Sequence, residues 1–401
     1  MTGSPRPRVL YVQFTNPAGC GPLEHSARML IDAGFDVTFL GVAPADDPMT
    51  FPTDAHLQLV LQSLPRPGWR QKLGYVRFAL WTLWWAYRRK PSWVYVSDRL
   101  AAPIGLAMRK LLGVRVVYHE HDSPDEIEGK TSIFLRSVLA ARRRLALCAD
   151  ACVLPNDQRA AEFARTTGRL HVEAVWNCPM RRDVVGERIY STAPPLRLLY
   201  HGSIVPVRLP LALIDAVAMV PAATLSIVGF ETIGHRDYLD QLKRRAEAIG
   251  IAARVQFAGT FPDRGELMSH CSTCDVGVSL LSGGFSDFNE RTMVGASSKV
   301  FEYLACGLAL LVANQPDWRA AYVDTGLGRS CDPESADSIA AALRWFVEHS
   351  AERVEMGRRG RQKILDEWNY DRTFRPVLEQ IVGSAGETRS DSALTTLETS
   401  V

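Results

Sequence analysis

Long apolar runs are absent from this chain of 401 residues. The longest strongly apolar stretch, FALWTLWWAY at 78–87, is too short to cross a bilayer, which takes roughly 20 residues. The first residues, MTGSPRPRVLYVQF, run directly into an expected strand and lack the apolar core of a secretory signal. From these two absences we expect a cytoplasmic protein without a membrane-spanning helix.

Strong net charge and paired cysteine motifs are also missing. The formal net charge is +2 at pH 7, so no nucleic-acid partner is expected. A single C-x-x-C occurs, CSTC at 271–274, and zinc would need two further ligands at a matching spacing. The eight cysteines are otherwise scattered, which predicts free thiols in a reducing compartment. The glycine stretch GCGPLE at 19–24 fails at the third glycine of G-x-G-x-x-G, which argues against a nicotinamide dinucleotide site.

The chain does contain two blocks in which short apolar runs alternate with helical patterns. Runs that are apolar on both faces and bounded by turns are typical of a parallel sheet covered by helices. We therefore expect an α/β protein with two doubly wound, Rossmann-like domains that face each other across a cleft. The expected strands are 9–14, 36–41, 93–98, 114–122, 151–156 and 172–177 in the first block, and 196–202, 224–229, 254–259, 276–281 and 308–313 in the second.

The expected domain limits follow from changes in composition. Residues 1–178 are expected to form the N-terminal domain, and the polar, proline-containing stretch 179–195 is expected to form a linker. Residues 196–365 are expected to form the C-terminal domain. A helix at 366–383 is expected to pack back toward the first domain, and the polar segment 384–401 is expected to be a disordered tail.

A helix that begins near SSK, at 297–299, carries an unexpected acid. Ser297 or Ser298 can cap this helix, and its first N–H groups with the helix dipole can bind an anion. Lys299 in the first turn is unfavourable unless something negative offsets it. Glu302, about one turn on, can accept two hydrogen bonds from a vicinal diol such as a ribose. The structural alternative is a surface helix with an incidental acid.

Two other strand ends are candidate sites. Arg208 follows Gly202 by six residues, and its guanidinium fork fits two phosphate oxygens; the alternative is a solvated arginine. Gly19 and Gly21 bracket Cys20 after the first strand, where a flexible functional loop and a plain turn are both reasonable interpretations.

The sequence HEHD at 119–122 allows three interpretations. Strand alternation places His119 and His121 on one face, where they could ligate a metal. Alternatively, one histidine contacts a sugar, or both are structural. The metal interpretation lacks matching ligands later in the chain.

The segment 66–97 contains seven basic residues and no acidic one, together with five tryptophans. We interpret it mainly as a core helix with an arginine-bearing outer edge. The alternative is peripheral contact with a membrane surface. The stripe expected to face the core comprises Leu73, Val76, Leu80, Leu83 and Tyr87, widened by Phe78, Trp81 and Trp85.

The stretch ASSKVFEYLACGLALLV, at 296–312, resembles the C-domain signature of family-4 glycosyltransferases, which are retaining enzymes of the GT-B fold. Further segments follow in the family's order: NPAGCGPLEHSARMLIDAGFDVTFL, VVYHEHDSP, CADACVLPN, VWNCP, LLYHGSIVPVR and LMSHCSTCDVGVSLL. The resemblance implies transfer of a sugar from a UDP-sugar or GDP-sugar to an acceptor hydroxyl or amine, with retention at the anomeric carbon. It implies no metal and no other cofactor, and a place in bacterial natural-product or polysaccharide biosynthesis.

The resemblance implies that the domain 1–178 binds the acceptor and that the domain 196–365 binds the nucleotide sugar. It also implies residue roles. Glu302 would bind the ribose, Arg208 and Lys299 the diphosphate, and His121 the reacting sugar. The further substrate-binding residues implied are Gly19, Gly21, Asp122, Gly202, Ser203, Gly229, Ser297 and Ser298.

Two positions depart from the family pattern. Many members carry a second glutamate eight residues before the one matching Glu302, where this chain has Val294; Glu290 or Asp287 is a candidate replacement. The frequent Gly-Arg after the first C-domain strand is Gly-Ser here, with Arg208 as the nearest cation. The alternatives in function are a metal-dependent hydrolase using the two histidines of HEHD, a sugar-nucleotide epimerase of the same fold, and a non-catalytic binder.

Overall fold

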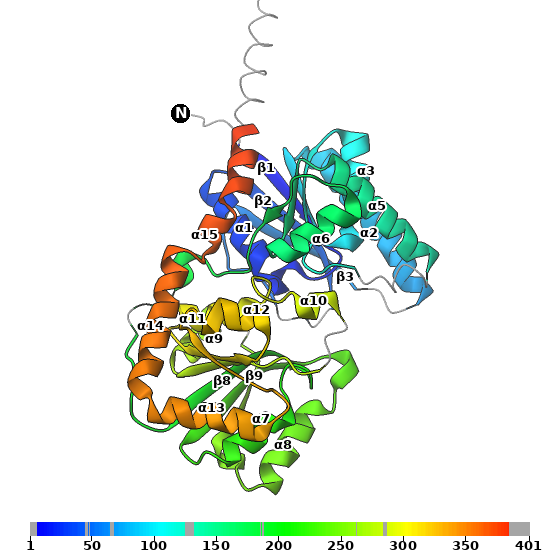
Figure 1. Ribbon diagram of the computed structural model, residues 1–401. Helices are drawn as coiled ribbons and strands as arrows, with labels where there is room; N and C mark the ends of the chain where they lie inside the picture. Colours follow the sequence, from blue (N-terminus) through cyan, green and yellow to red (C-terminus); the bar gives the residue numbers. More distant parts are fainter. Residues whose placement is uncertain are drawn as a thin grey trace, which may run out of the picture. The chain divides into compact units, whose positions relative to one another are not determined.

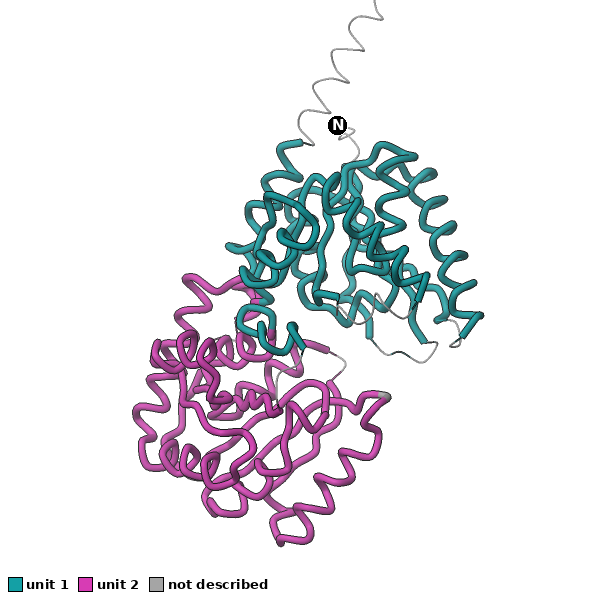
Figure 2. Tube along the Cα trace, turned by 45° about the vertical axis from the view of Figure 1, so that its right-hand side comes forward, with its two compact units in different colours: residues 1–177, 287–296, 370–401 teal, residues 178–286, 297–369 magenta. Residues whose placement is uncertain are grey.

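The computed structural model describes residues 6–44, 47, 49–64, 68–124, 132–184, 186, 188–261, 263–283 and 287–384. The chain divides into two compact units, coloured separately in Figure 2. Unit 1 comprises Met1–Asn177, Asp287–Ala296 and Tyr370–Val401, and unit 2 comprises Cys178–Ser286 and Ser297–Asn369.

Unit 1 is built on a seven-stranded parallel sheet in the order β3-β2-β1-β4-β5-β6-β7 (Figure 1). The order reverses between β1 and β4, so the loops after these strands leave the sheet at its topological switch point, where ligands bind in open α/β sheets. The strands are β1 (Arg8–Val12), β2 (Asp36–Ala43), β3 (Leu57–Ser63), β4 (Trp93–Ser97), β5 (Arg115–His119), β6 (Ala151–Leu154) and β7 (Glu173–Ala174).

Helices cover both faces of this sheet. Gly34 and Gly113 adopt left-handed φ values of 93° and 66° just after two of them, a conformation that is typical of glycine at a helix end. The helices are α1 (Gly21–Asp32), α2 (Trp69–Arg89), α3 (Ala102–Leu112), α5 (Ile133–Cys148), α6 (Asp157–Thr167), α10 (Phe288–Arg291) and α15 (Tyr370–Thr373), with the short turns η1 (Pro17–Gly19) and η2 (Arg99–Ala101).

Unit 2 is built on a six-stranded parallel sheet in the order β10-β9-β8-β11-β12-β13, which reverses between β8 and β11. Its strands are β8 (Leu196–Ile204), β9 (Ala223–Glu231), β10 (Val255–Gly259), β11 (Val276–Ser279), β12 (Ala309–Ala313) and β13 (Gly328–Cys331). Its helices are α7 (Leu211–Ala218), α8 (Tyr238–Ala248), α9 (Arg264–Ser272), α11 (Ser298–Ala305), α12 (Pro316–Trp318), α13 (Ala336–Glu348) and α14 (Ser350–Asp366), with the turns η3 (Arg181–Asp183), η4 (Ile233–His235), η5 (Ala252–Arg254) and η6 (Arg319–Val323). Two doubly wound α/β sheets confirm the expected fold class.

The structure adds two strands that the sequence did not reveal. The edge strand β3 has no fully buried residue, so its pattern lacks the apolar run of a central strand. The edge strand β13, GRSC, has only four residues and carries Arg329. Edge strands need less apolar surface than central ones, which explains why both were missed.

The units also differ from the expected domain limits. Asp287–Ala296, expected within the domain 196–365, belongs to unit 1, whereas the expected linker 179–195 belongs to unit 2. The chain belongs to unit 1 again from Tyr370. Of the expected tail, Ser384 lies in a helical segment, and the remainder lies outside the described residues.

The expected core stripe of α2 is wrong in part: Phe78 is fully buried and Trp81 and Trp85 pack against the core, but most of the other expected positions face outward. The fully buried residues of this helix are Tyr75, Phe78, Thr82 and Ala86. Leu73, Val76, Leu80 and Tyr87 are all exposed, and Leu83 is only partly buried against the core.

Candidate active site

The N-terminus of α11 is fixed beside the end of β8 by Tyr303. Gly277 in β11 makes this possible, because a Cβ there would lie 2.2 Å from the Tyr303 ring. The Tyr303 hydroxyl accepts a hydrogen bond from the His201 backbone N–H (3.0 Å) and donates one to the Val278 carbonyl (3.3 Å). The predicted helix and the strand end LYHG are therefore brought together.

The side chain of Lys299 lies against Gly202 at the end of β8. A Cβ on Gly202 would lie 3.4 Å from Lys299 Nζ, and the backbone there has a φ of 121°, which disfavours other residues. The ammonium lies 4.7 Å from the centre of the Tyr200 ring. Burial, together with the positive charge of Arg208, outweighs the attraction of the Glu302 carboxylate and lowers the pKa of Lys299 to about 7. The charged form of this lysine is therefore disfavoured compared with that of an exposed lysine.

Arg208 lies in the turn between β8 and α7. Its Nη1 donates to Ser203 Oγ at 2.9 Å. Ser203 stands where the family pattern often has an arginine, and here its hydroxyl helps to position Arg208. Among the described residues, no salt bridge involves Arg208 or Lys299. The two cations thus share one strand end without a carboxylate bound to either.

Glu302 is ionised and already paired. Its side chain is 5% exposed, with Oε1 lying 2.6 Å from Arg264 Nη1 and Oε2 lying 3.1 Å from His201 Nε2. Burial alone would raise the pKa of Glu302, but Arg264 and His201 outweigh it and lower the pKa well below its ordinary value. The sequence predicted an open carboxylate, whereas the structure holds it between two basic side chains.

Ser297 stands at the N-cap position of α11, and its side chain makes no capping hydrogen bond. The hydroxyl therefore does not occupy the first N–H groups of the helix, which begins at Ser298. Gly229 has a structural reason to be glycine. It lies in register with Gly202, and a Cβ on Gly229 would lie 1.8 Å from the Gly202 carbonyl oxygen.

In unit 1, His121 lies just beyond β5 in a set of polar contacts. Its backbone N–H donates to Asp98 Oδ1 (3.2 Å), and Nε2 lies 3.0 Å from Ser97 Oγ and 3.6 Å from Cys20 Sγ. Burial alone would lower the pKa of His121, but Cys20, Asp98 and Asp122 outweigh it and raise the pKa to about 9. His121 is therefore an imidazolium at neutral pH.

His119 is a structural histidine. It is fully buried, and its Nδ1 lies 2.8 Å from the Tyr95 hydroxyl. Burial and the neighbouring His121, whose ring centre is 4.1 Å away, lower the pKa of His119 well below its ordinary value. Across the described residues, no group of three or more His, Cys, Asp or Glu side chains is placed to hold a metal ion.

Gly19 and Gly21 frame the contact that Cys20 makes with His121. Gly19 ends η1, and a Cβ there would lie 3.2 Å from Met49 Sδ. Gly21 is the first residue of α1, with Cys20 as its N-cap. The cysteine, which the sequence did not single out, is the side chain of this loop that contacts a candidate site residue.

Asp122 is bound to an arginine that sequence reasoning missed. Arg159 in α6 is 2% exposed, and its Nη1 donates to Asp122 Oδ1 (3.0 Å) and to the His121 carbonyl (2.5 Å). It also donates to the Asn289 carbonyl (2.9 Å) and to Thr292 Oγ1 (3.1 Å). Arg159 therefore joins the end of β5 to the segment Asp287–Ala296.

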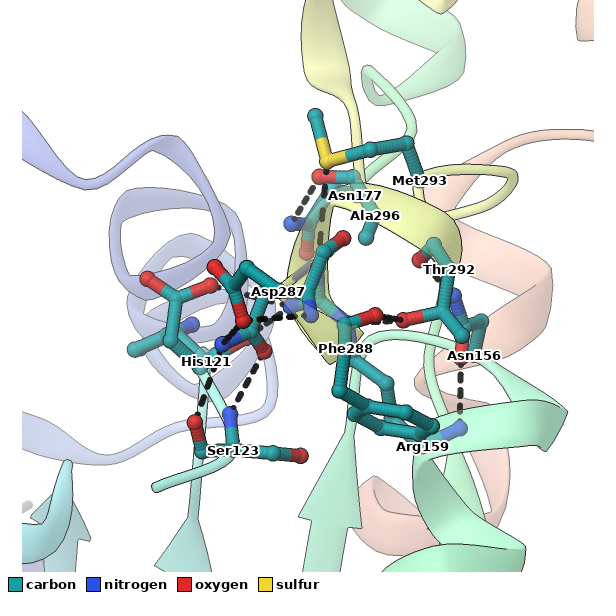
Figure 3. Close-up of polar contacts among 12 residues, drawn as sticks. His121, Ser123, Asn156, Arg159, Asn177, Asp287, Phe288, Thr292, Met293 and Ala296 are labelled. Carbon is teal, nitrogen blue, oxygen red and sulfur yellow. Dashed lines mark hydrogen bonds and ion pairs between the residues drawn. The ribbon is translucent and has the colours of Figure 1, made fainter. Parts of the chain in front are cut away.

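The same segment is held by two asparagines. Asn156, labelled beside Thr292 in Figure 3, donates from Nδ2 to the Thr292 carbonyl at 2.7 Å. It also donates to the Val294 carbonyl at 2.7 Å. Asn289 exchanges two hydrogen bonds with the backbone of Ser123, at 2.8 and 2.9 Å. These contacts explain why Asp287–Ala296 belongs to unit 1.

Two family models match the chain over most of its length. The model "Glycosyl transferase 4-like domain" matches residues 23–177, and "Glycosyl transferases group 1" matches residues 191–363. The chain is a glycosyltransferase of the GT-B fold. The second match contains every candidate residue of unit 2, and the first contains His121 and Asp122 but not the loop of Gly19 and Gly21.

Solved structures share the fold of this glycosyltransferase at low identity. HepE of Anabaena in complex with UDP is 17% identical with a TM-score of 0.66, covering 96% of this chain and 100% of its own. Sucrose-phosphate synthase of Thermosynechococcus elongatus is 15% identical with a TM-score of 0.67, covering 97% and 100%. WaaG, a glycosyltransferase involved in lipopolysaccharide biosynthesis, is 14% identical with a TM-score of 0.65, covering 94% and 100%. No curated relative matches the sequence.

The glycosyltransferase differs from the family pattern where Val294 replaces a glutamate. Of the two candidate replacements, Asp287 caps α10 by accepting the Asn289 backbone N–H at 3.0 Å. Glu290, three residues after Asp287 and within α10, is the second candidate. The capping role of Asp287 leaves Glu290 as the acid without an assigned structural task.

Proposed function

We propose that this glycosyltransferase moves a sugar from a UDP-sugar or GDP-sugar to an acceptor hydroxyl or amine, with retention at the anomeric carbon. The observation that carries the proposal is the pair of cations at the end of β8. Lys299 and Arg208 lie close enough for one charge to lower the pKa of the other, with no salt bridge to a described carboxylate. A diphosphate bound there would neutralise both.

The first N–H groups of α11 add to this anion site, since the helix begins beside Gly202 and its N-cap side chain leaves them unbound. As the donor's glycosidic bond breaks, negative charge grows on the departing diphosphate. Fixed cations and N–H groups stabilise that charge without a metal ion. In the front-face course implied for retention, a donor phosphate oxygen can help take the acceptor proton.

Glu302 is assigned to the donor's ribose. A carboxylate offers about four acceptor positions, and Arg264 and His201 use two of them. The low pKa of Glu302 keeps it an acceptor at any working pH. The pairs to Arg264 and His201 would hold its orientation before the donor arrives.

His121 is assigned to hydrogen bonding with the reacting sugar or the acceptor, because its raised pKa makes it a donor at neutral pH. UDP and UDP-glucose are bound by the structural neighbour HepE, which supports a uridine donor. No observation favours the metal-dependent hydrolase.

Calorimetry tests the donor site directly. UDP, GDP and their glucose conjugates are titrated near pH 8 in two buffers of different ionisation enthalpy. Because an anion raises the pKa of Lys299 from about 7, binding should take up about one proton. The uptake should fade toward pH 6, where Lys299 is already protonated, and should be absent in Lys299→Met.

The control is Lys243→Met, which alters an exposed lysine of the same unit. Donor binding without proton uptake, or uptake that persists in Lys299→Met, would contradict the assignment. The anomeric configuration of the product, read by NMR, decides retention. Activity in excess chelator decides metal independence, and nucleotide binding with no glycoside formed from any acceptor offered would favour an epimerase or binder.

A further inference from the structure

Helix α2 presents an exposed apolar face that no described part of the chain covers. Its members recur at intervals of four, three, four, four and three residues, which keeps them on one side of a helix. Their exposure runs from 52% at Val76 to 70% at Trp69. This outer stripe comprises Trp69, Leu73, Val76, Leu80, Trp84 and Tyr87.

The outer stripe is not an extension of the core. Tyr75, Phe78, Thr82 and Ala86 occupy the opposite side of α2 and are buried in unit 1. The helix therefore has two apolar faces, and folding of unit 1 uses only the inner one. An open surface pocket of about 480 Å³ lies beside Trp69 and Leu73. Leu64 also lines this pocket, which extends the exposed apolar surface.

The charges around this face are of one sign. Helices α2, α3 and α5, which lie together on one side of the unit 1 sheet (Figure 1), contain no aspartate or glutamate. They carry five, two and four arginines or lysines respectively. Only Arg109 and Arg142 of these form salt bridges among the described residues.

The cations of α2 lie on both edges of the outer stripe. At about 100° per residue, Arg70, Arg77 and Arg88 fall on one edge and Lys72 on the other. Two copies of this chain paired through their stripes would place these like charges against one another. A second copy is therefore a poor occupant of the face.

We propose that the outer stripe of α2 is a docking surface for an anionic lipid bilayer. The apolar side chains would enter the boundary between headgroups and acyl chains, and the flanking cations would contact lipid phosphates. Trp69 and Tyr87, near the two ends, are residue types suited to the headgroup level. No described helix is long and apolar enough to cross a membrane, so the helix would lie in the interface.

Vesicle co-sedimentation of the full chain tests this surface. Vesicles of phosphatidylcholine with about 30% phosphatidylglycerol are compared with pure phosphatidylcholine, in about 50 mM and about 500 mM salt. We expect binding to the anionic vesicles at low salt, with at least about tenfold weaker binding at high salt, because each cation near the surface contributes about fivefold.

The decisive variant is Leu73→Gln/Leu80→Gln/Trp84→Gln. It replaces three exposed apolar side chains by glutamine, which is polar and has a high helix propensity. It should bind at least about tenfold more weakly with an unchanged thermal midpoint. The matched control, Leu170→Gln/Ile189→Gln, removes two apolar side chains that are also highly exposed but lie elsewhere. It should bind as the unaltered chain does.

Tryptophan quenching by anionic vesicles with brominated acyl chains gives a second measurement on the unaltered chain. Quenching should fall in Trp69→Phe/Trp84→Phe. Absence of sedimentation with anionic vesicles at low salt would overturn the proposal, as would equal binding by the triple variant. Equal binding to neutral and anionic vesicles would contradict the proposal that the lipid surface must be anionic. A dimer that the triple variant dissociates, without vesicle binding, would assign the face to self-association.

Discussion

The candidate residues of the two units differ in how their charges are balanced. In unit 1, Arg159 is bound to Asp122, and His121 lies against Asp98 and Cys20. In unit 2, Lys299 and Arg208 share a strand end with no salt bridge to a described carboxylate. The same fold thus carries one set of groups whose charges are satisfied internally and one set that a diphosphate would complete.

The pKa values express this difference in opposite directions. The pKa of His121 is raised to about 9, so its charged form is favoured by the protein. The pKa of Lys299 is lowered to about 7, so its charged form is disfavoured until an anion binds. The charged form of His121 is thus stabilised within unit 1, whereas that of Lys299 lacks a salt-bridge partner among the described residues of unit 2.

The largest expected effect comes from Glu302, the exception within unit 2 because its charge is already paired. Glu302→Ala should lower the free energy of unfolding by about 3–5 kcal/mol, since the Arg264 guanidinium loses its carboxylate partner and His201 loses its hydrogen-bond partner. Transfer should also be lost. Chemical denaturation and a donor-turnover assay measure the two effects.

A double variant separates them. Glu302→Ala/Arg264→Met removes both partners of the pair and should recover part of the lost stability without restoring transfer. If Glu302→Ala alone cost less than about 1 kcal/mol, the ion pair would not be a buried one. Full stability with full turnover would remove Glu302 from the site.

Arg159 tests the internal balance of unit 1. Arg159→Met should cost about 3 kcal/mol, because Asp122, Thr292 and the carbonyls of His121 and Asn289 lose their donor. Hydrogen exchange should rise specifically in residues 287–296. Mass spectrometry of deuterated peptides, with a denaturation curve, measures both.

Arg165 offers a matched control on the same helix. It pairs with Glu162 at the surface, so Arg165→Met should change stability by less than about 0.5 kcal/mol and leave exchange in 287–296 unchanged. If the two substitutions had equal effects, the hydrogen bonds of Arg159 would contribute no more to stability than the surface ion pair of Arg165.

Lys299 sharpens the contrast because stability and binding should move in opposite directions. Lys299→Met should weaken diphosphate binding by about 100-fold, through loss of a charged hydrogen-bond donor. The free energy of unfolding at pH 6 should rise by about 1–3 kcal/mol, since a disfavoured buried ammonium is removed. Calorimetry and denaturation at pH 6 give the two values. A loss of stability at that pH would indicate that the ammonium already has a partner in the folded protein.

The sequence predicted this contrast only in part. The apolar runs of the central strands predicted both sheets, because a buried parallel strand needs such a run. The helix start at Ser297–Lys299 and its closeness to Gly202 were also predictable, since consecutive parallel strands deliver their ends to one edge. The spacing gave no sign of Arg264 or Arg159, which reach Glu302 and Asp122 from helices far away in the chain.

Helix α2 shows a different limit. Its sequence contains two apolar stripes, and periodicity alone cannot say which one faces the sheet. Four of the five residues that define the expected stripe are exposed, because the inner face includes Thr82 and Ala86, whose small or polar side chains contribute little to a hydrophobic pattern. The absence of acids was the more informative signal for the outer face.

The smallest expected effect is a pH dependence that distinguishes the two units. Because the pKa of His121 is raised from about 6.5 to about 9, its contribution to stability is complete below pH 6.5 and is lost as the pH rises through 9. His121→Gln should therefore be less stable than the unaltered chain by about 1–2 kcal/mol at pH 6, and nearly as stable above pH 9. Lys299 acts in the other direction, with stability rising between pH 7 and 10.5. Taking the difference between variant and unaltered chain at each pH cancels that contribution.

Cys20→Ser tests the cause of the raised pKa, since Cys20 is its largest favourable contributor. In this variant the pKa of His121 should fall back toward 6.5, so the pH range over which its contribution to stability is lost should become narrower. The exposed histidine variant His171→Gln should give a difference curve that is flat across the range. A flat curve for His121→Gln as well would mean that His121 is neutral in the folded protein, and the charge balance ascribed to unit 1 would then be absent.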